Sequence, residues 1–267
     1  MIQGIYDERQ LDIAEFEAVG LAKDGQLLLE HEDLKALLSG RRTQMMELKD
    51  LYLDGFHISA INAKVSLKES GGRPELLIHP LYKEKLAPNY LNDTEAEALE
   101  KGDIENLEKR IMDGEGDPRT VLVEFDRETN EYIVTDTERI LAPDFVNGEE
   151  LSLDKKERYR KGKEVELDDG TKFQYAGTER EGLRSNKIAL IASIIVDGGI
   201  SFLLYQGLNA LFNKKHDTRS MEMSDGYRKA FSDLKTAEGD PEEWLKRQLQ
   251  HPDKEYSRGY GRGGNAR

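Results

Sequence analysis

Cysteine is absent from all 267 residues, which excludes disulfide bonds, thiolate nucleophiles and cysteine-ligated zinc or iron–sulfur sites. The chain also lacks a GxSxG nucleophile motif, a P-loop and a dinucleotide-binding fingerprint. Histidine is scarce, and no pair of histidines has a metal-ligand spacing such as HExxH. The histidines are His31, His57, His79, His216 and His251. We therefore expect a non-enzymatic protein, with no catalytic residues, no metal ligands and no cofactor.

An excess of basic residues is also missing, since 39 Lys and Arg face 53 Asp and Glu. Residues 187–267 hold 13 of the basic and 11 of the acidic residues, which leaves a net charge of −16 for residues 1–186. An acidic body argues against phosphate contact, and so against nucleic-acid binding by that body. The N-terminus shows no basic segment followed by a long apolar core, so we expect the body to be cytoplasmic.

Long hydrophobic runs are absent with one exception, residues 188–212, IALIASIIVDGGISFLLYQGLNALF. As one helix this run would be about 37 Å long, enough to cross a hydrocarbon core of roughly 30 Å. Apolar residues would cover every side of that helix, which is typical of burial in protein or lipid. The predicted hydrophobic helical segment is defined by Ile188, Ile191, Ile194, Ile195, Phe202, Leu203, Leu204, Leu208, Leu211 and Phe212.

A polar break at Asp197, Gly198 and Gly199 leaves two interpretations of this run open. In the first, one transmembrane helix anchors the protein in a bacterial inner membrane, and Asp197 at its centre costs about 2.5–3.5 kcal/mol. In the second, two short helices fold at the break into a buried hairpin. We favour the anchor, because eight or nine large apolar residues would offset the cost of one carboxylate.

The body shows short helical and strand patterns that predict an α+β fold with antiparallel hairpins. A capping box of Asp12 and Glu15 starts one predicted helix, and Gly20 ends it. Further helices are expected at residues 32–38, 95–101, 104–112, 153–161 and 225–237, with another starting at Asp240. Strands are expected at residues 45–53, 58–67, 75–78, 121–125, 132–134, 165–167 and 171–175.

Two basic features are candidate contact sites. Arg41 and Arg42 lie in a predicted helix-to-strand turn, where they would contact a phosphate or an acidic partner, or would be solvated turn charges. Arg258 and Arg262 alternate with Gly and Tyr in the C-terminal tail, as in RNA-binding segments, although a plain flexible tail has the same composition.

Several phrases resemble an uncharacterised family, a domain of unknown function encoded on conjugative and mobilisable elements of anaerobic gut bacteria. The phrases are ALLSGRRT, LDGFHI, AKVSLKE, LLIHPLYKE, VLVEFDRETNEYIVTDTE, KERYRKGKEVELDDGTKFQY and RSNKIALIASIIVDGGISFLLYQGLNALF. The resemblance covers roughly residues 34–215 and leaves the N-terminal helices outside. It implies a setting among mobile-element accessory proteins, and it supplies no activity and no catalytic residues.

We therefore predict five segments: an N-terminal helical segment (1–40), an acidic α+β body (41–182), the hydrophobic helical segment (186–213), a helical C-terminal segment (214–255) and a disordered tail (256–267). The predicted function is a non-enzymatic interaction or scaffold protein of a mobile genetic element, tethered to the inner membrane, with an unknown protein partner for the acidic body. The alternative is a soluble nucleic-acid-processing accessory protein, in which the run is a buried hairpin and the basic tail contacts DNA or RNA.

Overall fold

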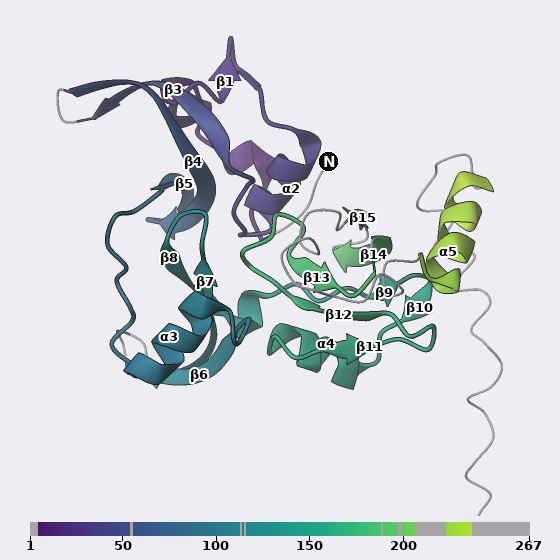
Figure 1. The fold of residues 1–267 in the computed structure, drawn as a ribbon. Helices are drawn as coiled ribbons and strands as arrows, with labels where there is room; N and C mark the ends of the chain where they lie inside the picture. The colour runs from purple at the N-terminus through teal and green to yellow at the C-terminus, as the bar shows by residue number, and fades with distance from the viewer. Residues whose placement is uncertain are drawn as a thin grey trace, which may run out of the picture.

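The computed structural model describes residues 5–53, 56–112, 114, 116–187, 189–196, 199–206 and 223–236 (Figure 1). In these ranges all strand pairs are antiparallel and all helices are short, which confirms the predicted α+β class. The helical elements are η1 (Glu8–Gln10), α1 (Ile13–Ala18), α2 (His31–Leu38), α3 (Asp93–Lys101), η2 (Thr137–Arg139), α4 (Leu153–Arg160) and α5 (Asp225–Thr236).

The N-terminal region is built on the sheet β3-β4-β5, whose three predicted strands are confirmed. Alternation along β4 directs Ala63, Val65 and Leu67 into a hydrophobic core shared with the N-terminal helices, and Lys64 and Ser66 to the other face. A small hairpin, β1-β2, packs beside α1. The strands of this region are β1 (Ala22–Lys23), β2 (Gln26–Leu27), β3 (Met46–Leu53), β4 (Phe56–Ser70) and β5 (Arg73–Pro80).

The start of α1 differs from the prediction in one detail. Asp12 caps the helix by accepting a hydrogen bond from the N–H of Ala14, but Glu15 does not complete a capping box. Instead, Glu15 Oε2 accepts a 2.9 Å hydrogen bond from the N–H of Leu76 on β5. The carboxylate therefore joins α1 to the sheet.

The middle region pairs α3 with the sheet β6-β7-β8, and the predicted hairpin at residues 121–134 is confirmed. The predicted helix at residues 104–112 is wrong, because this stretch forms an edge strand paired along β7. Gly102, in the left-handed conformation (φ 72°), ends α3, and Ile104, Leu107 and Ile111 then pack on the core beneath it. The strands are β6 (Leu107–Met112), β7 (Pro118–Asp126) and β8 (Glu131–Asp136).

The C-terminal region contains a hydrophobic core of its own, in which Tyr159 of α4 packs against Phe173 and Tyr175. Ser152 caps α4 as predicted, and the predicted hairpin around residue 170 is present. The strands are β9 (Phe145–Val146), β10 (Glu149–Glu150), β11 (Val165–Glu166), β12 (Lys172–Tyr175), β13 (Leu183–Ser185), β14 (Ala189–Val196) and β15 (Gly199–Gln206).

The hydrophobic run forms strands where a helical segment was predicted. Where the structure describes it, the run forms the antiparallel pair β14-β15, in a sheet of order β10-β9-β14-β15, and the predicted helix is wrong. Leu190 and Ala192 belong to the C-terminal core, Ala189 and Ile191 are equally buried, and α5 packs against β14. A strand covered on both faces is apolar at every position, so its sequence shows no strand periodicity.

Within the described ranges, no helix combines the length and the apolar character needed to cross a membrane. Several residues of the predicted segment lie outside these ranges: Ile188, Asp197, Gly198, Leu208, Leu211 and Phe212. The helix predicted at residues 225–237 is present as α5. The helix predicted from Asp240 and the tail with Arg258 and Arg262 lie outside the described residues.

Candidate functional site

Buried charged side chains join the N-terminal and middle regions. The polar face of β4 and β5 lies against the turn that connects β7 to β8 (Figure 1). Basic side chains come from the N-terminal region, and carboxylates come from the turn and from the strand ends on either side of it. We call this group the charged cluster, and it consists of Arg42, Lys64, His79, Asp126, Glu128 and Glu131.

The ion pairs in the charged cluster are close, and the pair of Lys64 with Asp126 is shielded from water. Lys64 Nζ lies 2.9 Å from Asp126 Oδ2 and 2.7 Å from Glu128 Oε2. Arg42 Nη1 lies 2.8 Å from Glu131 Oε2 and 3.6 Å from Asp126 Oδ2. The side chains of Lys64 and Asp126 are 3% and 2% exposed, whereas that of Glu128 is 63% exposed. Removal of Asp126 would therefore leave Lys64 with only an exposed carboxylate beside it.

Ser66 of β4 joins two members of the charged cluster, His79 and Glu131, in an arrangement like a serine hydrolase triad. Ser66 Oγ lies 2.8 Å from His79 Nε2, and His79 Nδ1 lies 3.1 Å from Glu131 Oε2. Burial alone would raise the pKa of Glu131, but hydrogen bonding from His79 and the charges of Arg42 and His79 lower it. The order of hydroxyl, imidazole and carboxylate is the one that activates a serine nucleophile.

Access argues against catalysis by this triad-like arrangement. Ser66 is 9% exposed and His79 is 8% exposed, so a substrate carbonyl would reach Oγ only if sheet and turn separated. Ser66 also lies within a regular strand, opposite Leu77, whereas a catalytic serine needs donors aimed at a developing oxyanion. The arrangement therefore works as a buried polar contact between two sheets.

The loop between β12 and β13, residues 176–182, connects all three regions. Its Thr178 carbonyl accepts a 3.2 Å hydrogen bond from Lys64 Nζ, and its Arg180 carbonyl accepts a 3.1 Å hydrogen bond from Arg41 Nε. Tyr159 Oη donates a 2.7 Å hydrogen bond to the carbonyl of Gly182. Because three regions contact one loop, it fixes their relative positions.

The same loop contacts a buried carboxyl group of the middle region. Glu124 on β7 is 2% exposed, and its Oε2 accepts a 2.8 Å hydrogen bond from the N–H of Gly177. Burial raises the pKa of Glu124 to about 8, despite the opposing effects of that N–H and of Arg184. Gly177 is required for close approach, because a Cβ there would lie 2.6 Å from the Glu124 carboxylate.

Buried hydrogen bonds centred on Asn147 hold the start of α5 in place, and they were not predicted from the sequence. We call this group, Asn147 with Asp169, Thr171, Ile191 and Ser224, the hub. Asn147, in the turn between β9 and β10, has φ 51° and is 7% exposed. Its Nδ2 lies within 3.3 Å of oxygens of Asp169, Thr171 and Ser224, while its Oδ1 accepts the N–H of Ile191. The Asn-Gly pair at residues 147–148 is the signal that could have predicted this turn.

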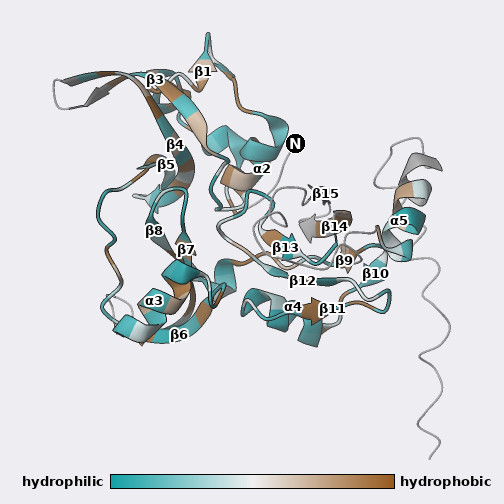
Figure 2. Cartoon of the chain, viewed as in Figure 1, coloured by the Kyte–Doolittle hydropathy of each residue, from teal (hydrophilic) through white to brown (hydrophobic). Residues whose placement is uncertain are grey.

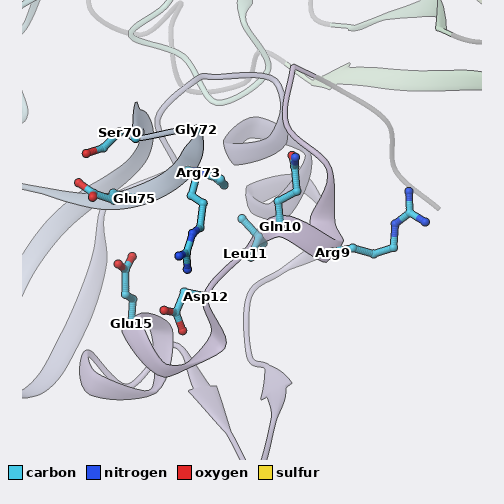
Figure 3. Close-up of a pocket in the computed structure, with 11 residues that line it drawn as sticks. Arg9, Gln10, Leu11, Asp12, Glu15, Ser70, Gly72, Arg73 and Glu75 are labelled. Atoms are coloured by element: carbon cyan, nitrogen blue, oxygen red, sulfur yellow. The ribbon is translucent and has the colours of Figure 1, made fainter.

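A polar pocket of about 720 Å³ opens between η1, the start of α1 and the turn joining β4 to β5. Figure 3 shows the side chain of Arg73 directed into this pocket, toward Asp12 and Glu15. Both carboxylates already accept backbone hydrogen bonds, at the α1 cap and from Leu76. In the described part of the chain, no group of three or more His, Asp or Glu side chains is arranged to hold a metal ion.

Both arginines of the predicted helix-to-strand turn, Arg41 and Arg42, bind groups of the chain itself. Arg42 is buried in the charged cluster, and Arg41 donates to the 176–182 loop. The carboxylates and carbonyls of the chain itself therefore satisfy these guanidinium groups. Ile191 and Ile194, predicted for a membrane segment, lie on β14, and Gly199, predicted as part of the break, starts β15.

Comparison with known proteins identifies one family model, described as a protein of unknown function (DUF4099), over residues 6–88. This match supports the predicted resemblance to an uncharacterised domain family. Its extent differs from the prediction, because it includes the N-terminal helices and ends shortly after β5. No curated protein and no solved structure matches the chain.

Proposed function

We propose that this chain is a non-enzymatic interaction protein, and that it contacts a protein partner through the segment between β5 and α3. We call residues 81–92 the strap. The observation that carries the proposal is the exposure of large apolar side chains on the strap: Leu81 is 66%, Tyr82 40% and Leu86 81% exposed. Figure 2 shows the strap as an extended segment between β5 and α3.

The strap is held firmly despite having no helix or strand. The N–H of Tyr82 donates a 2.9 Å hydrogen bond to the Thr129 carbonyl, and its own carbonyl accepts one from Asn130 Nδ2. Lys85 pairs with Glu100 at 2.5 Å and lies over the ring of Phe125. Ordered connections of this length are often functional, and apolar side chains held in place before binding lose little entropy on binding.

The closed triad-like arrangement also supports a non-enzymatic function. The nucleophile candidate Ser66 is buried, and its histidine and carboxylate serve the contact between two sheets. The setting that we propose, an accessory protein of a conjugative or mobilisable element, rests on the resemblance of the sequence phrases. An enzyme would need an accessible reacting group, which the described polar clusters do not offer.

The test compares Leu81→Ser/Leu86→Ser with a matched control, Leu153→Ser, which removes an 85% exposed leucine from α4. Cross-linking mass spectrometry in the native host identifies the protein bound to the wild type, and the interaction is then remeasured with both purified proteins. We expect the strap variant to lose binding by at least about tenfold, as two interface leucines are removed, and the control to retain it. Equal binding by all three proteins contradicts the strap interface, and hydrolase activity lost in Ser66→Ala contradicts the non-enzymatic function.

A further inference from the structure

Strand β15 is an edge strand with an unusual composition. It lies at the end of the sheet β10-β9-β14-β15, and no described strand pairs with its outer edge. Its eight residues, GISFLLYQ, contain no charge and no proline. An edge strand that is long and apolar presents free backbone N–H and C=O groups to any other strand, so natural proteins usually protect such edges.

Every other described edge strand of three or more residues carries this protection. Each has at least one charged residue, and β5 also has Pro74 and Pro80. The charged residues include Lys49 on β3, Arg73 on β5, Lys109 on β6, Asp136 on β8 and Arg184 on β13. The remaining edges are only two residues long. Among the described edge strands of three or more residues, β15 alone has neither a charged residue nor a proline, which indicates an edge that is paired in the functional state.

We infer that β15 pairs with β15 of a second copy of this chain, antiparallel and about a two-fold axis, which joins two four-stranded sheets into one. In an antiparallel pair related by a two-fold axis, one residue lies opposite its own symmetry mate, because neighbouring residues point to opposite faces of the sheet. An axis at Leu203 pairs residues 200–206 of the two copies and sets Ser201 opposite Tyr205 of the other copy. Because β15 has no charge, this pairing brings no like charges together at the edge, even though each chain has a net charge of −14.

The two-fold relation also explains why a charge is excluded along the whole strand. A single Lys or Glu on β15 would appear twice in the paired sheet, near its own symmetry mate if it lay at the centre. An edge that accepted an extended segment of a different protein would tolerate a charge matched by that partner. The inference is independent of the strap, which lies in a different sheet region, so strap variants should leave the dimer intact.

The first test is the molar mass of the full chain by analytical ultracentrifugation over a concentration series. We expect a monomer–dimer equilibrium for the wild type, a dimer dissociation constant at least about tenfold higher for Ser201→Lys, and no change for the matched control Ser201→Ala. Far-UV circular dichroism and a thermal melt establish that each variant is folded. A monomer at every concentration, or a dimer unaffected by Ser201→Lys, overturns the inference.

The second test fixes the register and benefits from the absence of native cysteine. Ser201→Cys and Tyr205→Cys proteins are mixed and oxidised. The two Cα atoms would lie about 4.5–5.5 Å apart in the paired strands, within disulfide range. We expect a disulfide between the two variants and none in Ser201→Cys alone, whose cysteines would lie about 14 Å apart. A disulfide in Ser201→Cys alone overturns the proposed register, and no disulfide in the mixture of two folded variants overturns the strand pairing.

Discussion

Lys64 and Asp126 lie 62 residues apart in the sequence, yet Lys64 Nζ donates a 2.9 Å hydrogen bond to Asp126 Oδ2 between side chains that are at most 3% exposed. This pair joins the N-terminal sheet to the turn of the middle sheet. A buried pair is costly to break, because the remaining charge loses its buried partner and has little contact with water. The contact therefore makes the two regions depend on each other for stability.

The first prediction follows from that dependence. Asp126→Asn should lower the free energy of unfolding by about 3 kcal/mol, because Lys64 and Arg42 lose a buried carboxylate and Lys64 keeps only the exposed carboxylate of Glu128. The double variant Lys64→Met/Asp126→Leu should recover part of this loss, since neither charge of the buried pair remains. Urea unfolding of both proteins measures the values. The control is Glu47→Gln, which removes an exposed ion pair with Lys49 and should change the free energy by less than about 1 kcal/mol.

The second prediction concerns the pH dependence of stability through Glu124. Its folded pKa of about 8 lies above the ordinary value of 4.5, so its stabilising effect is complete below about pH 4.5 and is lost as the pH rises to about 8. Glu124→Gln stays neutral at every pH. Relative to the wild type, this variant should therefore gain stability as the pH rises, by about 3 kcal/mol at pH 7.

Chemical unfolding at pH 5, 6, 7 and 8 checks this difference. The result expected is a gap between Glu124→Gln and the wild type that widens at each step from pH 5 to pH 8. A gap that is constant across the whole series would show that Glu124 ionises near its ordinary pKa in the folded protein. Glu97→Gln is the control, because Glu97 is 62% exposed and pairs only at the surface.

The sequence predicted those elements whose signals are local. The β7-β8 hairpin combines β-rich segments with a polar turn, and α3 has Asn92 as its cap and Gly102 at its end. Strand β6 was missed because its residues, LEKRIM, suit a charged helix as well as an edge strand. What makes it a strand is its pairing with β7, which depends on residues further along the chain.

The hydrophobic run was mistaken for a helix because burial on both faces removes the alternation that identifies a strand. The described strands pair Val196 with Gly199. In the sequence, an Asp-Gly pair between two apolar segments is a signal for a β-hairpin that outweighed neither helical interpretation. The charged cluster and the 176–182 loop were beyond prediction for another reason. Most of their contacts join residues separated by 52 to 139 positions, such as His79 with Glu131 and Arg41 with Arg180, and no local pattern encodes such pairs.

The third prediction concerns the attachment of α5 through Asn147. Asn147→Gly preserves the left-handed backbone but removes the side-chain hydrogen bonds to Ser224 and Ile191. We expect a loss of about 1–3 kcal/mol in the free energy of unfolding and faster hydrogen exchange of the α5 amides. Asp24→Gly, at φ 52° in the exposed β1-β2 turn, is the matched control and should cost nothing. Unchanged exchange in α5 would show that Tyr227 and Ala230 hold the helix without the hub.

The last prediction separates a strand in the protein core from a segment that merely follows a folded body. Leu190 of β14 is fully buried in the same core as Leu122, Tyr159 and Phe173. Leu190→Ala should therefore lower the free energy of unfolding by about 2–5 kcal/mol, as expected for a large residue removed from a packed core. A protein truncated after Glu181 loses this strand entirely and exposes that core, so it should aggregate or lose cooperative melting. A membrane anchor would behave in the opposite way, with the truncated body melting cooperatively and Leu190→Ala leaving its midpoint unchanged. Thermal melts and size-exclusion chromatography of the three proteins decide between the two outcomes, and the burial of Leu190 is the reason to expect the first.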